Sequence, residues 1–284
     1  IQLKENANVV MSGLSFPSTP FTWMNRVGAE NVRIAQPING GMPAQQLFDL
    51  GDENTAVISL CSVENTTGFR HDLKEISDFC QERGIYLALD ITQGVASMKV
   101  DVKETPIDFM VSSTFKWLGG LFGFGFGYVS KRVLDKVDPV YVGWTGNKNR
   151  FDHSKYVLSL SDDANKFESG MLQWESLQGL EESVKLYMSL GRDDVEEYIL
   201  SLVEYLYEQL ETVEHVSIMG NFEKKHRSGI VYINFPADWE LNNDIMAAHG
   251  IRANRSGNAI RTALHYYNNK ADVDKLVAFL KEYK

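Results

Sequence analysis

A lysine between two aromatic residues is the first side chain of this sequence that could form a covalent bond with a ligand. Lys116 stands between Phe115 and Trp117, after the apolar run at 107–111 and before the glycines at 119–120. Aromatic neighbours shield an amine from water, which lowers its pKa and favours the nucleophilic form of a Schiff-base lysine. Taken alone, the pattern fits a surface lysine with core aromatic neighbours better, because a lone residue is rarely catalytic.

Two polar residues follow the apolar run at 85–89. Asp90 ends this run, and Gln93 comes three residues later. An acid in this place puts a carboxylate at the carboxyl edge of a parallel sheet, where open α/β folds bind ligands. The alternative is an Asp that begins a turn. Taken alone, that alternative is the better reading, because Asp is common at strand ends.

An arginine near the C-terminus has the chemistry to bind a carboxylate. Arg261 follows Ile260 in a predicted strand, after the glycine-containing stretch at 255–258. A guanidinium donates two parallel hydrogen bonds to a carboxylate, as an amino-acid substrate requires. A surface ion pair is the alternative, and Arg252 and Arg255 compete for the same role.

The elements that must position these side chains alternate in type through the first half of the chain. Short β-branched runs alternate with helical patterns, which is typical of βαβ units and a mostly parallel sheet. The predicted strands are 8–11, 31–35, 56–60, 86–89 and 109–112, with a further strand at 124–129 that closes the sheet. Apolar residues at helical spacing predict a helix over 72–83, which Gly84 ends.

The second half of the chain has a different composition. A polar, irregular stretch at 138–166 precedes two long amphipathic helical patterns, a strand and a final helix with apolar residues at positions i, i+3, i+4 and i+7. These four elements are predicted at 172–190, 193–213, 229–235 and 272–284. We therefore expect a large domain over residues 1–191 and a small α+β domain over residues 192–284.

Composition excludes several classes of protein. Of the 284 residues, 44% are hydrophobic and 23% charged, and no apolar run approaches the roughly 20 residues of a membrane helix. The net charge of −10 argues against nucleic acid, because such binding depends on clustered Lys and Arg. The first residues show no secretory signal, so we expect a cytoplasmic protein. Cys61 and Cys80 lack metal-ligand spacing, and we expect two core thiols and no metal site.

Taken in order, these groups resemble the class-V aminotransferase family of fold-type-I enzymes that use pyridoxal 5'-phosphate (PLP). The family includes cysteine desulfurases, kynureninases and isopenicillin-N-epimerase-like proteins. The resemblance spans nearly the whole chain. The matching pieces are the segment 63–68, the pair Asp90 and Gln93, the spacing of Ser113 and Lys116, the glycines at 119–127, the segment 167–170, and Arg261 before a Tyr-Asn pair.

What the resemblance implies is a large, mostly parallel-sheet domain with a small C-terminal α+β domain, a small amino acid as substrate, and a homodimer. Lys116 would hold PLP as a Schiff base and then move the Cα proton of the substrate. Asp90 would pair with the protonated ring nitrogen, and Arg261 would hold the substrate carboxylate. The other cofactor contacts would be Gln93 and Asn65 near the ring hydroxyl, Ser113 at the phosphate, Phe16 on the ring face, and Trp144, from a region that often belongs to the partner subunit.

Transamination is the default reaction that we expect. Kynureninase-like or desulfurase-like cleavage, epimerisation, and a non-catalytic relative are the alternatives, because reaction type depends on which Cα bond stands perpendicular to the ring. A binding protein of the α/β class without PLP is a further alternative.

This sequence departs from the family pattern in two respects. Desulfurase relatives carry His before the lysine, Thr after the Phe-Glu-x-Gly motif and a reactive Cys before the carboxylate arginine. Here Phe115 and Met171 stand at the first two positions and no Cys occurs in 249–260, which disfavours a cysteine-persulfide mechanism. Relatives also carry about 70 to 90 residues before the point where this chain begins. We therefore expect the N-terminal part of the large domain to be missing.

Overall fold

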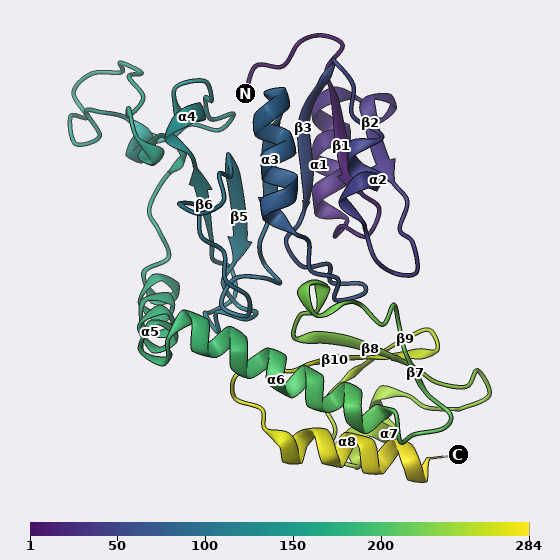
Figure 1. Ribbon diagram of the computed structural model, residues 1–284. Helices are drawn as coiled ribbons and strands as arrows, with labels where there is room; N and C mark the ends of the chain where they lie inside the picture. The colour runs from purple at the N-terminus through teal and green to yellow at the C-terminus, as the bar shows by residue number, and fades with distance from the viewer. Residues whose placement is uncertain (284) are drawn as a thin grey trace.

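The larger of two sheets forms the upper part of the molecule in Figure 1. The computed structural model describes residues 1–283, so Lys284, the last residue of the predicted final helix and small domain, lies outside them. The strand order is β2-β1-β3-β4-β5-β6, with β1 to β5 parallel and β6 antiparallel at the edge. The predicted α/β class and mostly parallel sheet are confirmed. The strands are β1 (Asn8–Ser12), β2 (Val32–Ala35), β3 (Thr55–Cys61), β4 (Tyr86–Asp90), β5 (Phe109–Ser113) and β6 (Gly125–Val129).

Helices cover both faces of this sheet. Successive strand side chains point to opposite faces, so Val9 and Val10 enter different apolar clusters. The helix α1 (Ser18–Val27) packs against the face that carries Val9, while α2 (Ala44–Phe48) and α3 (Leu73–Arg83) pack against the face that carries Val10. The result is a three-layer arrangement that leaves the carboxyl ends of the parallel strands facing the lower part of the molecule (Figure 1).

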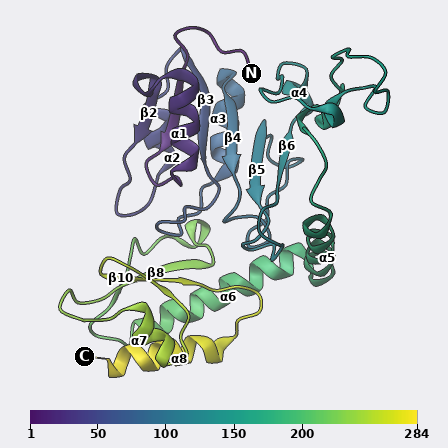
Figure 2. The ribbon, with the colours of Figure 1, turned by 180° about the vertical axis from the view of Figure 1, so that it is seen from behind.

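A smaller antiparallel sheet lies below, with three helices on its far side (Figures 1 and 2). Its strand order is β7-β8-β10-β9. Leu206, Ile233, Ile260 and Leu276 are buried in the cluster between sheet and helices. The elements are β7 (Ser217–Ile218), β8 (Ile230–Asn234), β9 (Asn254–Ser256), β10 (Ala259–Ala263), α6 (Arg192–Leu210), α7 (Asn243–Ala248) and α8 (Lys270–Glu282).

The segment between the two parts is irregular apart from short turns and two helices, α4 (Lys131–Leu134) and α5 (Trp174–Leu190). The short 3-10 turns of the chain are Ala29–Asn31, Trp144–Gly146, Ala164–Phe167 and Lys224–His226. Ser176 is the one buried residue of α5. No helix of residues 1–283 is both long and apolar enough to cross a membrane. The location of the protein in the cell stays a prediction.

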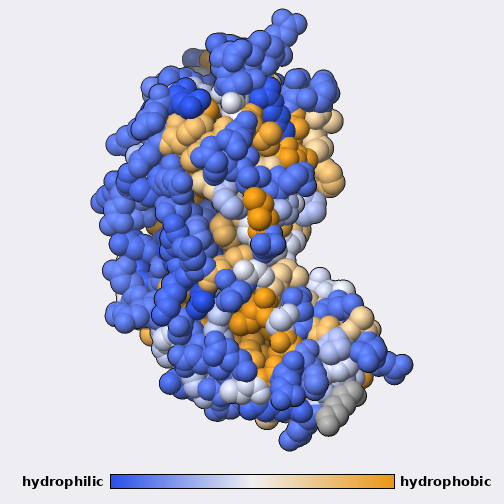
Figure 3. Space-filling view, turned by 45° about the vertical axis from the view of Figure 1, so that its right-hand side comes forward, coloured by the Kyte–Doolittle hydropathy of each residue, from blue (hydrophilic) through white to orange (hydrophobic). Residues whose placement is uncertain are grey.

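A further apolar cluster joins the upper and lower parts. It brings Val63 and Trp117 of the upper part together with Ile199 of α6 and Ile230 of β8. Figure 3 shows the waist between the parts, where the surface is hollowed and apolar side chains are exposed above and below it. The predicted division into domains after residue 191 is not decided by this arrangement and stays a proposal.

The predicted strands of the large sheet match the observed strands to within one residue at each end. The helices α1, α2, α4 and α7 were not predicted. The sequence of α1 contains Pro20 and two Thr, and none of its residues is buried. Trp23, Met24 and Val27 of α1 are partly buried against the sheet, but Pro20 and the two Thr lower the helix propensity of this segment, so it was not recognised as a helix.

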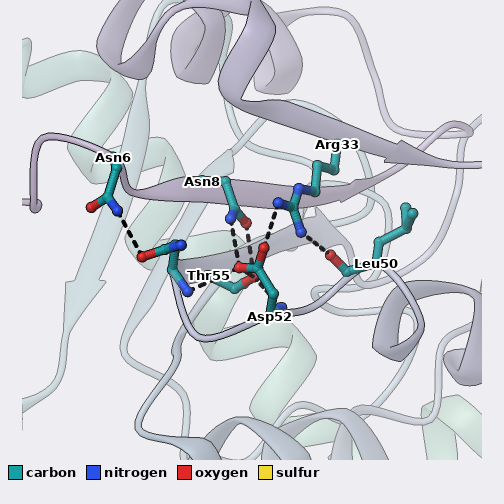
Figure 4. A network of polar contacts seen from close by, with 7 residues as sticks. Asn6, Asn8, Arg33, Leu50, Asp52 and Thr55 are labelled. Atoms are coloured by element: carbon teal, nitrogen blue, oxygen red, sulfur yellow. Dashed lines mark hydrogen bonds and ion pairs between the residues drawn. The ribbon is translucent and has the colours of Figure 1, made fainter.

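A network of hydrogen bonds and one ion pair links β1, β2 and β3 near their amino ends (Figure 4). Asp52 accepts hydrogen bonds from Asn8 Nδ2 at 2.8 Å and Arg33 Nη2 at 2.5 Å, and Arg33 Nη1 donates to the Leu50 carbonyl at 2.7 Å. Thr55 donates to Asn8 Oδ1 at 2.8 Å. The bonds from Asn8 and Arg33 hold the pKa of Asp52 well below its usual range. The two charges of this network, Asp52 and Arg33, therefore pair with each other.

Candidate active site

Lys116 and most of the predicted cofactor-binding residues meet at the opposite, carboxyl edge of the sheet. Strands β3, β4 and β5 end there at Cys61, Asp90 and Ser113, and the loops that follow carry Asn65, Gln93 and Lys116. Parallel strands bring such residues together because all their carboxyl ends lie on one edge. They enclose a cavity of about 300 Å³, which is lined by Phe16, Ser18, Cys61, Asn65, Asp90, Thr92, Gln93, Ser113, Phe115 and Lys116.

Lys116 is half-buried in this cavity. Burial, followed by the nearby charge of Arg261, lowers the pKa of the amine, and the charge of Asp90 partly opposes this shift. Its Nζ lies 5.7 Å from the centre of the Phe16 ring. The amine is therefore placed beside an aromatic face and a carboxylate, in surroundings that favour its nucleophilic form.

Asp90 both begins a turn and lines the cavity, so the two alternatives given for it in the sequence analysis hold together. Its Oδ1 accepts a hydrogen bond from the Thr92 backbone N–H at 2.8 Å, which is the expected turn, and its side chain also lines the cavity. The hydroxyl of Thr92 then accepts from the Ser113 N–H at 3.2 Å. Sequence reasoning missed Thr92, although its place between Asp90 and Gln93 would have identified it as part of the same turn.

A second cavity of about 490 Å³ adjoins the first and shares Asn65, Gln93, Phe115 and Lys116 with it. Arg261 of β10 reaches into this cavity, where its Nε donates to the Asn65 carbonyl oxygen at 3.2 Å. The Tyr232 hydroxyl donates to the same oxygen at 3.0 Å. The other lining residues are Trp117, Asn254, Arg261, Ala263, His265 and Tyr267.

Three charged side chains line the two adjoining cavities and form no ion pairs there. Within residues 1–283, Lys116, Asp90 and Arg261 take part in no ion pair. Burial lowers the pKa of Arg261. The side-chain oxygen of Asn65 is also buried without a hydrogen-bond partner in this part of the chain. Because such groups are costly to bury alone, the arrangement is typical of a site that binds a charged ligand.

The structure separates Arg261 from its two competitors. Arg252 and Arg255 are exposed, and neither lines the two cavities. The Nε of Arg255 donates to its near neighbour, the Gly257 carbonyl, at 2.8 Å. Arg261 is therefore the arginine of this loop that faces Lys116.

Trp144 is the one predicted site residue that the chain does not bring to these cavities. It lies in a short turn, in edge contact with His153, and lines a separate cavity of about 580 Å³ together with residues 142–158. A role of Trp144 in the site of a partner subunit stays a prediction.

The expectation that both cysteines are core thiols is confirmed by their burial. Both are buried and unpaired, but Cys61 also borders the first cavity, because β3 ends there. Burial raises the pKa of Cys61 well above its ordinary value and that of Cys80 to about 12. The sequence analysis did not identify His265 or Tyr267 as site residues, although Tyr267 belongs to the Tyr-Asn pair after Arg261 and both residues line the second cavity.

Comparison with known proteins identifies the family. The family model of class-V aminotransferases matches residues 1–276. The chain belongs to the class-V aminotransferase family. It is 27% identical to a "Probable cysteine desulfurase" of Borreliella burgdorferi (98% of this chain, 70% of the relative), and 26% identical to an uncharacterized aminotransferase of Bacillus subtilis (94% and 70%).

A solved structure with the same fold is that of C-DES. The cystine C-S lyase C-DES, in complex with its product cysteine persulfide, superposes with a TM-score of 0.86 at 18% identity, over 98% of this chain and 75% of that one. A C-DES variant carries glycine covalently linked to its PLP cofactor. The PLP-dependent transferase fold of type I is therefore confirmed for this chain, and its cofactor is PLP.

The residues present fit this cofactor. The first cavity offers an amine, a carboxylate and an unpartnered buried amide oxygen around one space with an aromatic ring on its side. These are the groups that an aldehyde, a protonated pyridine nitrogen and a ring hydroxyl require. No group of three or more His, Cys, Asp or Glu side chains suited to a metal ion occurs in residues 1–283.

Proposed function

We propose that this enzyme transfers the amino group of a small α-amino acid, with Lys116 as the residue that holds PLP covalently. The observation that supports it is the convergence of Lys116, Asp90 and Arg261, all without partners of opposite charge, on two adjoining cavities. An amine can bind the aldehyde of PLP, an acid can pair with its ring nitrogen, and a guanidinium can bind the carboxylate of an amino acid.

Asp90 and its neighbours would hold and orient the cofactor. When bound, PLP supplies an electron sink for the charge that develops at the substrate Cα. Asp90 would keep the ring nitrogen protonated. Gln93 and Asn65 would lie near the ring hydroxyl, Ser113 would bind the phosphate, and Phe16 would cover one ring face.

Lys116 would carry the proton transfer. Its lowered pKa favours the free amine, which would take a proton from Cα and return it at another atom. Arg261 would hold the substrate carboxylate through its terminal nitrogens, since its Nε already donates to the Asn65 carbonyl. The bond to Asn65 fixes the guanidinium plane beside the amine.

A C–S lyase is the second candidate, because relatives of this chain bear the name cysteine desulfurase. Both thiols of this chain are buried and have raised pKa values, which opposes a persulfide on the enzyme. A lyase whose sulfur leaves on the product needs no enzyme thiol. Cleavage of that kind therefore stays open, while the chemistry at Lys116 and Arg261 would be the same.

The deciding experiment separates these reactions by their products. We expect the purified protein with PLP to show a visible absorption band that shifts with an amino acid such as alanine or cysteine. Under transamination, oxo acid forms in proportion to enzyme until an acceptor oxo acid is added. Continuous release of ammonia and sulfide without an acceptor indicates a lyase, and a band that no amino acid shifts indicates a non-catalytic relative.

We also propose a homodimer. The segment around the Trp144 turn exposes many large apolar side chains, as expected of an interface. They are Val140, Tyr141, Phe151, Tyr156, Val157, Leu158 and Met171. Sedimentation at micromolar concentration should give a dimer, and the double variant Tyr141→Asp/Tyr156→Asp should weaken it. A parent monomer with full activity would contradict this proposal.

A further inference from the structure

The indole of Trp117, the residue after Lys116, is held from two sides. Its Nε1 donates to Gln93 Oε1 at 2.9 Å. One ring face stacks on the imidazole of His265, with ring centres 5.1 Å apart and planes 10° apart. Trp117 thus contacts a cofactor-pocket residue at one end and the strand-end loop of the small sheet at the other.

The tautomer of His265 follows from its bonding. Its Nε2 lies 3.0 Å from the backbone carbonyl oxygen of Trp117, which can only accept, so Nε2 carries the proton. Burial lowers the pKa of His265, which keeps the ring neutral. Its Nδ1 is buried and has no partner among residues 1–283. With Nε2 engaged and Nδ1 shielded, His265 is not placed to exchange protons with a substrate.

The backbone around His265 ties this contact to Arg261. His265 lies four residues after Arg261, and its N–H donates to Asn268 Oδ1 at 2.9 Å. Trp117 packs closely on Gly229, where a Cβ would lie 2.5 Å from the Trp117 ring and 2.7 Å from the Leu264 carbonyl. Only glycine lets the small sheet approach the indole this closely. A continuous path of contacts therefore joins the Lys116 loop to the strand of Arg261.

We propose that Trp117 and His265 are positioning residues, which fix the distance between the Lys116 amine and the Arg261 guanidinium and hold the Gln93 amide toward the cofactor. This inference rests on the proposed function for its meaning in catalysis. The physical reason is that Lys116 and Arg261 belong to different sheets, so the distance between them depends on contacts across the waist. The stack of Trp117 on His265 and the bond from His265 Nε2 to the Trp117 carbonyl supply such contacts beside the site.

The first test uses the apoprotein. It measures the pKa of Lys116, which depends on how close the charge of Arg261 lies. The nearby Arg261 charge contributes to lowering the Lys116 pKa. His265→Phe keeps an aromatic stack but loses the bond to the Trp117 carbonyl, so the pH midpoint of Lys116 modification by cyanate, followed by peptide mapping, should rise. His265→Gln keeps a donor near the Nε2 position and should restore the parent midpoint. A lower melting temperature with an unchanged midpoint would mean a structural role only and would overturn the inference.

The second test uses the PLP-loaded protein. Trp117→Phe removes the donor to Gln93, so the pH midpoint of the cofactor absorption band should shift. KM for the amino acid should rise about 5- to 10-fold in His265→Phe, the factor of one hydrogen bond, with a smaller change in kcat. If the parent has neither band nor turnover, the proposed function fails while the cyanate test still decides the inference. If His265→Phe does not fold, the milder Trp117→Phe variant decides it through the same cyanate midpoint.

Discussion

The amino ends and the carboxyl ends of the large-sheet strands differ in how their charged side chains are paired. At the amino edge, Asp52 forms an ion pair with Arg33 and accepts a hydrogen bond from Asn8, so these two charges are paired within the chain. At the carboxyl edge, Asp90 and Lys116 line a cavity, and neither forms an ion pair within residues 1–283. The same sheet thus uses paired charges to hold its strands and keeps unpaired charges for a ligand.

This contrast predicts which edge affects chemistry and which affects stability. A side chain whose charge is satisfied internally contributes to the folded state, so its loss lowers stability without changing the site. A charged side chain that is paired only by a bound ligand lowers the stability of the free protein. Its removal should abolish function and leave the fold intact. Four experiments test this division.

The largest effect is expected for Lys116→Ala. The variant should lose covalent attachment of PLP and lower turnover by at least about 10²- to 10⁴-fold, the range of general acid–base catalysis. Its melting temperature without cofactor should remain near that of the parent. Borohydride reduction followed by peptide mapping should place PLP on Lys116 in the parent. Reduced PLP on Lys131 or Lys166 instead would refute the assignment.

The next effect concerns Arg261→Lys. Lysine keeps the charge but loses the planar pair of donors, so amino-acid binding should weaken by about 1.5 to 3 kcal/mol. Saturation of the absorption change with amino acid measures this, and the exposed Arg255→Lys is the matched control. Weakening in the Arg255 variant alone would move the carboxylate site to the other arginine.

The pH dependence of the Lys116 amine should respond to both of its charged neighbours in the apoprotein. Arg261 lowers the pKa and Asp90 raises it, so Arg261→Gln should move the midpoint of cyanate modification upward and Asp90→Asn downward. Modification of Lys131 in the same digest controls for the reagent. Shifts of the same sign in both variants would show that the charges do not act on this amine as described.

The smallest effect is expected at the amino edge. Asp52→Asn should lower the melting temperature by about 2 to 4 °C and leave PLP binding unchanged. Because the folded pKa of Asp52 is depressed, its contribution is present above the ordinary carboxyl pKa and is lost as pH falls through the folded value. The difference between parent and variant should therefore shrink in acid. A change in cofactor binding would break the contrast between the edges.

Much of the site was predictable from local pattern. Asp90 follows a buried apolar strand, and Lys116 follows another, so their places at one edge come from strand periodicity and the parallel topology. Six of the eight predicted residues line the first cavity and Arg261 lines the second, while their roles stay proposals. The paired network of Asp52 escaped prediction because Asn, Asp and Thr between strands read only as turn residues.

The sequence by itself determined the positions of the strands along the chain, the residue types at their carboxyl ends and the family that these together indicate. These features depend on neighbours within a few positions, where backbone periodicity is decisive. Only the tertiary structure decided which arginine faces Lys116, that Trp117 reaches Gln93 and His265, and that Trp144 lies elsewhere. Contacts such as Arg261 with Asn65 join residues 196 positions apart. These contacts depend on how the two sheets pack against each other across the waist. Local sequence patterns do not predict this packing.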